Sequence, residues 1–538
     1  MVLLMDQLDS KYDIIIIGSG FGGSVSALRL AEKGYKVLVL EKGKEYKTKD
    51  FPKSNWNLRK FLWFPNLFLY GIQCITLLKN VFILHGTGVG GGSLVYANTL
   101  LEPLDKAFDD KRWIGGGWKE KLAPFYKKAK FMLGATKAQH LGETDKILKK
   151  TAKTLNRLDT FNEVDVGIFF SDNKGEKVPD PYFDGKGPDR NSCILCGGCM
   201  VGCRHNAKNT LDKNYLYLAK KLGVKIAPEK EVLRVFESKD SAYIVEYKKS
   251  TGLLRYKRKV KAKKVIFSGG VMGTVKLLLK CKHKGYLSKL SDRLGDFVRT
   301  NSESILGVRS RSESKAKDFN QGIAISAGFK PNDTTHIETC RYGKGQNSMS
   351  ILTTHIFSKS SKMPAVFLWL GNIISNPIAF FKDSIPYKWS SQTVILLIMQ
   401  PISNYLKFSY KRRWWRFGFK SMNSELSSGQ HIPSYIPIGE DVAKKIAKDI
   451  KGVPMSTYMD TFLNIPTTAH ILGGATMGET DKSGVVDTNF EIFNYPGLYV
   501  IDGSVVPSNL GVNPSLTITA LAEYAMSKFP EKNHEFNN

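Results

Sequence analysis

The turn between residues 18 and 23 constrains the fold of this chain more than any other feature of its sequence. It follows an apolar, β-branched run, Tyr12–Gly18, that is typical of a buried strand, and it precedes Ser24–Lys33, which alternates at helical spacing. A second buried strand, Lys36–Leu40, completes a βαβ unit of about 30 residues. Three glycines occupy the turn at the spacing G-x-G-x-x-G: Gly18, Gly20 and Gly23. The sequence therefore predicts an α/β fold that begins with parallel strands.

The same turn has the chemistry of a dinucleotide-binding loop. Gly18 allows the tight turn, Gly20 lets the backbone approach a pyrophosphate, and Gly23 lets the helix pack closely on the strand. The helix N-terminus then faces the phosphates. Glu41 follows the second strand about 20 residues later, where a carboxylate accepts hydrogen bonds from a ribose diol. The position near the N-terminus favours FAD over NAD, although loop spacing leaves both open.

Residues 85–98, HGTGVGGGSLVYAN, form a second and denser glycine cluster. So many glycines do not suit the interior of a helix or strand. Such a loop leaves backbone N–H groups free to bind an anion or a flat ring; a purely structural loop is the alternative. Two loops of this kind indicate that both ends of one long cofactor are held. The candidate cofactor-binding residues of this cluster are Gly88, Gly90, Gly91, Gly92, Ser93 and Asn98.

The second glycine cluster and the segment 498–526, LYVIDGSVVPSNLGVNPSLTITALAEYAM, resemble the glucose–methanol–choline (GMC) flavin oxidoreductases, and within them the cholesterol oxidases. The resemblance implies an α/β chain with a Rossmann-type FAD-binding domain and an interleaved α+β substrate domain built on an antiparallel sheet. We expect residues 1–105, 191–300 and 456–538 in the FAD-binding domain, and residues 106–190 and 301–455 in the substrate-binding domain. One departure is Tyr96, where the steroid-oxidising relatives carry asparagine.

The resemblance also implies catalytic residues for the oxidation of an alcohol. His470 matches the active-site histidine of the family, which takes the hydroxyl proton or orients the substrate oxygen. Asn513 would donate to that oxygen or to the flavin edge, and an N-cap role before Pro514 is the alternative. Asp502 and Gly503 match the contact to the ribityl–phosphate region.

Glu338 is the best match to the carboxylate that shifts the steroid double bond in cholesterol oxidases. An apolar pocket would raise its pKa toward that of a useful acid–base group. The alternative is an ordinary sheet carboxylate paired with Arg341. We expect His336, on the same predicted strand, to point to the opposite face.

Four of the seven cysteines stand close together: Cys193, Cys196, Cys199 and Cys203. Their spacing is that of a bacterial-type [4Fe–4S] loop, with Arg204 in place of the usual proline. Three interpretations stay open. The cysteines hold an iron–sulfur cluster that relays electrons, they hold a structural zinc ion, or they are free or redox-active thiols.

The charge is the unusual part of the composition, because Lys+Arg 79 against Asp+Glu 49 gives a formal net charge of +30. Nothing else fits a nucleic-acid-binding fold, so we expect no nucleic-acid partner. The run KRRWWR at 411–416, beside the apolar segment 392–408, suits an anionic membrane surface, and an apolar substrate lid with a lysine-rich surface is the alternative.

The apolar stretches 61–84, 364–381 and 392–408 are all too interrupted to predict a transmembrane helix. Without a signal-peptide pattern, we expect a cytoplasmic protein with peripheral membrane contact.

These observations predict an FAD-dependent enzyme that oxidises a lipophilic alcohol, and a 3β-hydroxysterol is the leading candidate substrate. Oxygen or another acceptor would reoxidise the flavin. The alternative is a flavin dehydrogenase or oxidase of long-chain or other lipophilic alcohols, without an isomerase step. It would pass electrons to a non-oxygen acceptor, and an iron–sulfur cluster is one route for them. A flavoprotein for electron transfer or membrane binding, without catalysis, is a third hypothesis.

Overall fold

The computed structural model describes residue 8 and residues 11–312, 318–356, 365–375, 377–412, 420–427 and 432–532. Its first seven-stranded sheet has the order β12-β2-β1-β15-β14-β13, with β25 also paired to β15. The strands are β1 Lys11–Ile17, β2 Val37–Leu40, β12 Lys225–Ala227, β13 Lys230–Glu237, β14 Tyr243–Lys249, β15 Lys257–Phe267 and β25 Leu498–Val500. Pairings among β12, β2, β1, β15 and β25 are parallel, and those of β13–β14 and β14–β15 are antiparallel. The predicted βαβ unit and its parallel sheet are confirmed.

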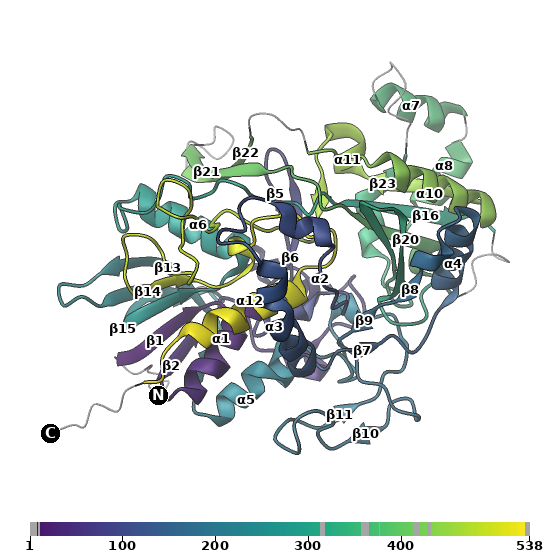
Figure 1. The fold of residues 1–538 in the computed structure, drawn as a ribbon. Helices are drawn as coiled ribbons and strands as arrows, with labels where there is room; N and C mark the ends of the chain where they lie inside the picture. The colour runs from purple at the N-terminus through teal and green to yellow at the C-terminus, as the bar shows by residue number, and fades with distance from the viewer. Residues whose placement is uncertain are drawn as a thin grey trace.

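Helices from both ends of the chain pack together beside this sheet, as Figure 1 shows for the purple α1 and the yellow α12. The helices here are α1 Phe21–Glu32, α3 Trp118–Met132, α5 Tyr215–Lys221, α6 Gly270–His283 and α12 Ser515–Lys528. Arg29 of α1 lies 2.8 Å from Glu523 of α12, whose side chain is fully buried. Tyr126 of α3 donates to Thr517 of α12 at 3.1 Å. Helix α3 thus packs in the core of the first sheet, although its residues fall in the range expected for the other domain.

The second seven-stranded sheet is antiparallel, with the order β19-β23-β16-β20-β18-β17-β8. Its strands are β8 Asn162–Glu163, β16 Ser304–Ser310, β17 Ile325–Asn332, β18 Thr335–Cys340, β19 Thr353–His355, β20 Thr393–Met399 and β23 Gly452–Thr457. Helices α4 Glu143–Thr154 and α10 Pro437–Asp449 pack against it. The apolar segment 392–408, considered above as a membrane contact or a lid, contributes the central strand β20, in which Leu396 and Ile398 are fully buried.

Smaller elements surround the two sheets. The other strands are β3 Trp63–Phe64, β4 Leu69–Tyr70, β5 Gln73–Leu77, β6 Phe82–Gly86, β7 Thr136–Lys137, β9 Asp165–Val166, β10 Lys177–Val178, β11 Arg190–Asn191, β21 Leu406–Arg412, β22 Lys420–Leu426 and β24 Thr467–Thr468. The remaining α-helices are α2 Leu58–Phe61, α7 Ala365–Ser375, α8 Pro377–Ser384, α9 Trp389–Gln392 and α11 Tyr458–Leu463. Helix α7 stands off the body of the molecule (Figure 1). Across the residues that the structure describes, no helix has the length and apolar character to cross a membrane. The basic run 411–416 lies outside the described residues from Arg413 onward.

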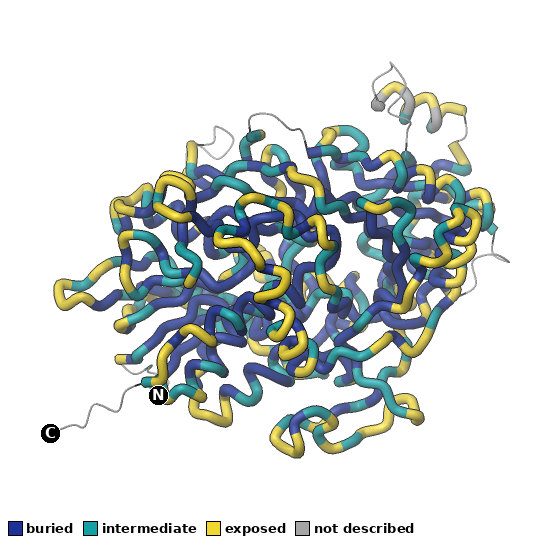
Figure 2. The backbone as a smooth tube through the Cα atoms, in the orientation of Figure 1, coloured by how far each residue is buried: buried dark blue, intermediate teal, exposed yellow. Residues whose placement is uncertain are grey.

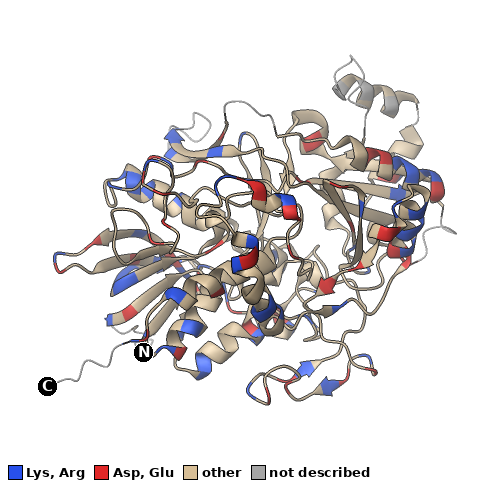
Figure 3. Cartoon of the chain, viewed as in Figure 1, with Lys and Arg blue, Asp and Glu red and all other residues tan. Residues whose placement is uncertain are grey.

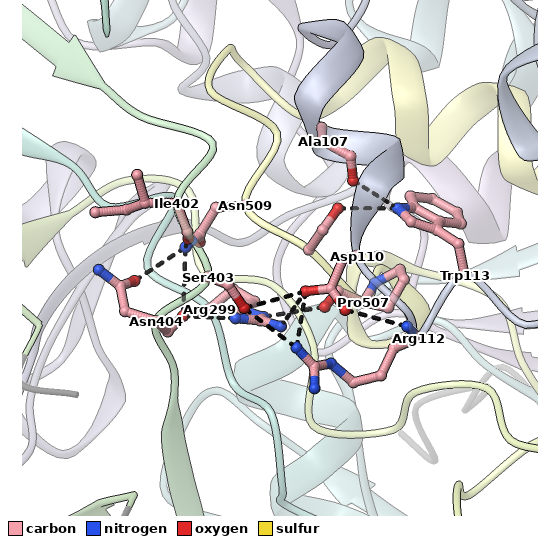
Figure 4. Close-up of polar contacts among 11 residues, drawn as sticks. Ala107, Asp110, Arg112, Trp113, Arg299, Ile402, Ser403, Asn404, Pro507 and Asn509 are labelled. Carbon is pink, nitrogen blue, oxygen red and sulfur yellow. Dashed lines mark hydrogen bonds and ion pairs between the residues drawn. The ribbon is translucent and has the colours of Figure 1, made fainter. Parts of the chain in front are cut away.

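A buried arginine joins four distant segments of the chain (Figure 4). Arg299 is fully buried, and its Nη2 lies 2.7 Å from the Asp110 carboxylate. The same guanidinium donates to the carbonyls of Pro507 at 3.0 Å and Asn404 at 2.8 Å. Asn509 in turn donates to Ile402 at 2.6 Å. The network holds the loop that leads to α12, and with it Asn513, against the rest of the fold.

Candidate active site

A cavity of about 490 Å³ is lined by residues from both seven-stranded sheets and from both glycine loops. The predicted site residues that line it are Gly18, Gly20, Glu41, Gly91, Gly92, His470, Asp502, Gly503 and Asn513. Segments that are hundreds of residues apart in the sequence therefore meet at one cavity.

Glu41 and Ser19 connect the two glycine loops. One oxygen of the Glu41 carboxylate accepts from the Ser19 backbone at 3.1 Å and from its hydroxyl at 2.8 Å. The other accepts from Gly43 at 2.8 Å and from Gly88 at 3.4 Å. The backbone of Gly90 donates to the Ser19 hydroxyl at 3.1 Å. The two loops, predicted separately, form one continuous cradle.

The cradle has no room for side chains at most of its glycines. Gly18 has φ +105°, and a Cβ there would lie 2.3 Å from the carbonyl oxygen of Ser268. A Cβ on Gly22 would lie 1.9 Å from the oxygen of Ile501, and one on Gly23 would lie 2.1 Å from that of Gly18. A Cβ on Gly20 meets nothing within 4 Å. The turn therefore packs closely on the strands behind it and is open at Gly20, which is the shape a pyrophosphate needs.

A third glycine turn, missed in the sequence analysis, also lines the cavity. Ser268, Gly269 and Gly270 follow β15 and lead into α6. The Asp502 carboxylate accepts from the Gly270 backbone at 2.8 Å and from the Thr274 hydroxyl at 2.6 Å. The signal was present, because a buried strand followed by Ser-Gly-Gly and a helix repeats the logic of the first turn.

His470 and Asn513 line the same cavity. Nδ1 of His470 lies 3.0 Å from Oε2 of Glu303, whose side chain is fully buried. The same oxygen accepts from the Thr468 hydroxyl at 2.9 Å and from the Ala469 backbone at 3.1 Å. Asn513 is buried, and its Oδ1 has no hydrogen-bond partner among the described residues. Pro514 is the N-cap residue of α12, so the alternative N-cap role of Asn513 is wrong.

Burial and charge act in opposite directions on the pKa of His470. Burial alone would lower the pKa, but the Glu303 carboxylate, and after it that of Glu338, raise the pKa above its ordinary value. Sequence reasoning missed Glu303, because a lone glutamate between Ser302 and Ser304 carries no local signal.

Glu338 is fully buried on β18. It shares a face of the sheet with Cys340, which lines the cavity, but Glu338 is not itself a lining residue. Its Oε1 lies 3.3 Å from Nε2 of His336, so the expectation that His336 points to the opposite face is wrong. Residues two apart in a strand share a face. Arg341 pairs with Asp145 at 2.6 Å, which removes the proposed pairing of Glu338 with Arg341.

Four of the predicted cofactor-binding residues shape the second loop without lining the cavity. Gly88 and Gly90 have φ values of +127° and +104°. Ser93 donates to the Gly90 carbonyl at 2.7 Å and accepts from the Leu211 backbone at 3.1 Å. Asn98 is buried, and its amide donates to Ile325 at 3.4 Å, which ties the loop to the second sheet.

The four clustered cysteines are free thiols: Cys196 is exposed, Cys193 and Cys203 are half-buried, and Cys199 is buried. No group of three or more His, Cys, Asp or Glu side chains within the described part of the chain is arranged to hold a metal ion. Burial raises the pKa of Cys193 to about 12. Among the three interpretations, the arrangement favours free thiols.

Comparison with known proteins identifies the family. The GMC oxidoreductase model matches residues 187–282 and 418–522, and a model of the FAD binding domain matches residues 13–49. A cholesterol oxidase of Acinetobacter baumannii is 43% identical over 97% of this chain and 95% of its own length. A cholesterol oxidase of Mycobacterium tuberculosis is 43% identical over 97% of this chain and 91% of its own length.

More distant relatives share the architecture. A long-chain-alcohol oxidase of Arabidopsis thaliana is 25% identical over 96% of this chain and 67% of its own length. Pyridoxine 4-oxidase from Mesorbium loti superposes with a TM-score of 0.62 at 14% identity, covering 96% of this chain and 99% of that one. The glycine cradle fits the FAD that these comparisons imply. The chain therefore belongs to the GMC oxidoreductase family and is an FAD-dependent alcohol oxidoreductase.

Proposed function

We propose that this enzyme oxidises a lipophilic alcohol, with a 3β-hydroxysterol as its substrate and oxygen as its electron acceptor. The observation that carries the proposal is the meeting of His470 and Asn513 at one cavity with the glycine cradle. The relatives named cholesterol oxidases, at 43% identity over nearly the whole chain, support the choice of substrate and acceptor.

The lining of the cavity supports a lipophilic substrate. Away from the glycine cradle, the cavity is walled by large apolar and aromatic side chains of the second sheet and its neighbours. They include Ile305, Leu306, Met349, Leu352, Trp389, Ile395 and Leu397. Binding of a steroid ring system buries both this apolar wall and the apolar surface of the steroid, which is favourable. The single hydroxyl of the steroid then needs only a few polar partners.

His470 is the base in this proposal. Its Nδ1 faces Glu303, so Nε2 is the nitrogen that receives the hydroxyl proton. Asn513 donates its amide to the same oxygen as negative charge develops on it. Bound FAD supplies the acceptor for the hydride that leaves the carbinol carbon. Glu303 holds the imidazole in orientation and stabilises the charge that it gains.

Glu338 serves a second step in this proposal. A buried carboxylate whose Oε2 has no hydrogen-bond partner among the described residues can take a proton from one carbon of the steroid and return it to another. That exchange would move the double bond after the alcohol has become a ketone.

The test mixes the purified enzyme anaerobically with cholesterol carried by cyclodextrin and measures the flavin absorbance. Oxygen is then admitted, and the release of hydrogen peroxide is measured. The proposal predicts that the flavin absorbance is bleached and that peroxide forms, and that His470→Ala retains FAD but loses both signals. Reduction by a long-chain alcohol such as dodecanol and by no sterol would favour the activity named for the Arabidopsis relative instead. Unchanged activity in His470→Ala would contradict the assigned base.

A further inference from the structure

The helical hairpin α7–α8 carries an exposed apolar surface that the catalytic reaction does not use. Phe367, Leu370 and Ile374 are spaced by three and four residues and form one stripe on α7. Phe367 is 58% exposed and Ile374 is 79% exposed. On α8, Ile378 is 72% and Phe381 59% exposed. Figure 2 shows the described residues of the projecting α7 mostly in the exposed colour, and Figure 3 shows none of them as charged.

The hairpin is fixed to the body of the protein through its other side. Trp369 of α7 makes edge-to-face contacts with Phe380 at 5.6 Å and with Phe462 of α11 at 5.7 Å. Phe380 is buried. The Asp383 carboxylate lies 2.5 Å from the guanidinium of Arg311. The outward stripe is thus held away from the core by packing on the inner side, and it presents apolar side chains to the surroundings.

The same surface continues to the wall of the cavity. Arg309 donates to the carbonyls of Asp383 at 2.5 Å, Ile385 at 2.7 Å and Tyr387 at 2.9 Å, which pins the chain after α8 onto β16. Ile385 and Tyr387 are exposed, whereas Trp389, two residues after Tyr387, lines the cavity.

The 3₁₀ turn Ser348–Leu352 repeats this alternation of exposed and cavity-lining residues. Met349 and Leu352 line the cavity, and Ile351 between them is 57% exposed. One layer of chain therefore separates the exposed apolar surface from the proposed binding site.

We infer that α7–α8 and residues 385–388 bind the surface of a lipid bilayer that contains anionic lipids, from which the substrate enters. The exposed charges of the segment 365–388 are positive, because Lys382 and Lys388 are exposed while its one acid, Asp383, is buried. Apolar side chains beside lysines suit the boundary between acyl chains and anionic headgroups. With 11 residues, α7 measures about 16 Å, roughly half of a bilayer core, so it lies in the interface. The inference rests on the proposed function only for the identity of the substrate.

The test compares two variants of the full-length holoenzyme on vesicles of phosphatidylcholine with 30 mol% phosphatidylglycerol, a composition chosen for the assay. The first is the triple variant Ile374→Ser/Ile378→Ser/Phe381→Ser. The matched control, Phe131→Ser/Leu222→Ser, removes exposed apolar side chains from α3 and from the end of α5. We expect the triple variant to bind vesicles at least tenfold more weakly and the control to bind like wild type. Equal binding by the triple variant would overturn the inference.

A cholesterol assay separates this inference from the proposed function. The triple variant should oxidise cyclodextrin-carried cholesterol like wild type and vesicle-borne cholesterol more slowly. A wild-type enzyme that oxidises neither form of cholesterol would refute the sterol substrate. The vesicle-binding result would then still decide whether this surface binds lipid.

Hydrogen exchange of the wild-type enzyme provides a measurement without variants. Vesicles should slow exchange in peptides from 365–388, and unchanged exchange would overturn the inference. Conversion from dimer to monomer in the triple variant, with unchanged vesicle binding, would assign the surface to a second copy and likewise overturn it.

Discussion

The Glu303 carboxylate lies 3.0 Å from Nδ1 of His470 at the cavity that also holds the glycine cradle. The carboxylate is held in turn by Thr468 and Ala469, so its position is set by the strand that leads to the histidine. A buried carboxylate behind a histidine fixes the orientation of the ring and favours its charged form.

Glu303→Gln should slow alcohol oxidation and change its pH dependence. We expect kcat to fall by up to about 10²-fold, toward the lower end of what a positioned acid–base group contributes. In its proposed role as the base, His470 must be neutral to accept a proton, so activity should rise with pH through its pKa. The Glu303 charge raises that pKa, and its removal should move the acidic limb of the kcat/KM profile to lower pH. Flavin content serves as the folding control, and an unmoved limb would show that Glu303 does not act on His470.

Glu338→Gln should separate the two proposed chemical steps, alcohol oxidation and double-bond migration. The glutamine keeps the volume of the buried side chain but cannot exchange a proton. We expect alcohol oxidation to continue while double-bond migration falls by about 10²-fold or more. The measurement is the ratio of the unconjugated to the conjugated ketone among the products. Migration at the wild-type rate would assign the isomerising group elsewhere.

Alanine at Gly22 and at Gly20 should have different effects, although only Phe21 separates the two residues. A Cβ at Gly22 would lie 1.9 Å from the Ile501 carbonyl, whereas a Cβ at Gly20 meets nothing within 4 Å. We expect Gly22→Ala to destabilise the fold by about 1–3 kcal/mol or more. Gly20→Ala should keep the unfolding temperature of the apoprotein and weaken FAD binding. Thermal unfolding and bound flavin, measured on the same samples, would test the contrast; equal unfolding temperatures for the two apoproteins would refute it.

Asp110→Asn should leave the buried Arg299 without its counter-charge (Figure 4). Burial lowers the pKa of Arg299 to about 10, but the guanidinium stays charged at neutral pH. Breaking a buried ion pair from one side costs about 3–5 kcal/mol. We expect a lower midpoint of urea unfolding. The exposed pair of Lys119 and Asp105 offers a control, since solvent screens that pair and Asp105→Asn should leave the urea midpoint nearly unchanged.

The clustered cysteines should react with a thiol reagent in the order of their exposure. Cys196 is exposed and Cys199 is buried with a raised pKa, so Cys196→Ser should remove the fastest phase of labelling and Cys199→Ser should not. Elemental analysis of the same protein would check the arrangement of the thiols, because about four iron atoms per chain would show that they gather around a cluster.

Local patterns made much of the fold and part of the site predictable. The first strand, turn and helix depend on spacings within one short segment, so the sequence was sufficient to predict them. The partner of His470 was not predictable in this way, because Glu303 meets Thr468 across 165 residues and only the folded chain brings them together. The run 393–399 shows a similar limit. Its six consecutive apolar residues, which follow Thr393, fit a buried strand as well as a membrane contact, and only pairing with β16 and β18 distinguishes the two.

The residues that line the cavity range from Ile17 in the first strand to Ile518 in the last helix. During synthesis, a ribosome must therefore release nearly the whole chain before the cofactor site exists. The two glycine loops of the cradle are synthesised early, and the cofactor site is complete only after β25 and α12 have been added. A nascent chain that stalls before residue 498 lacks both of these elements, so it should retain no flavin.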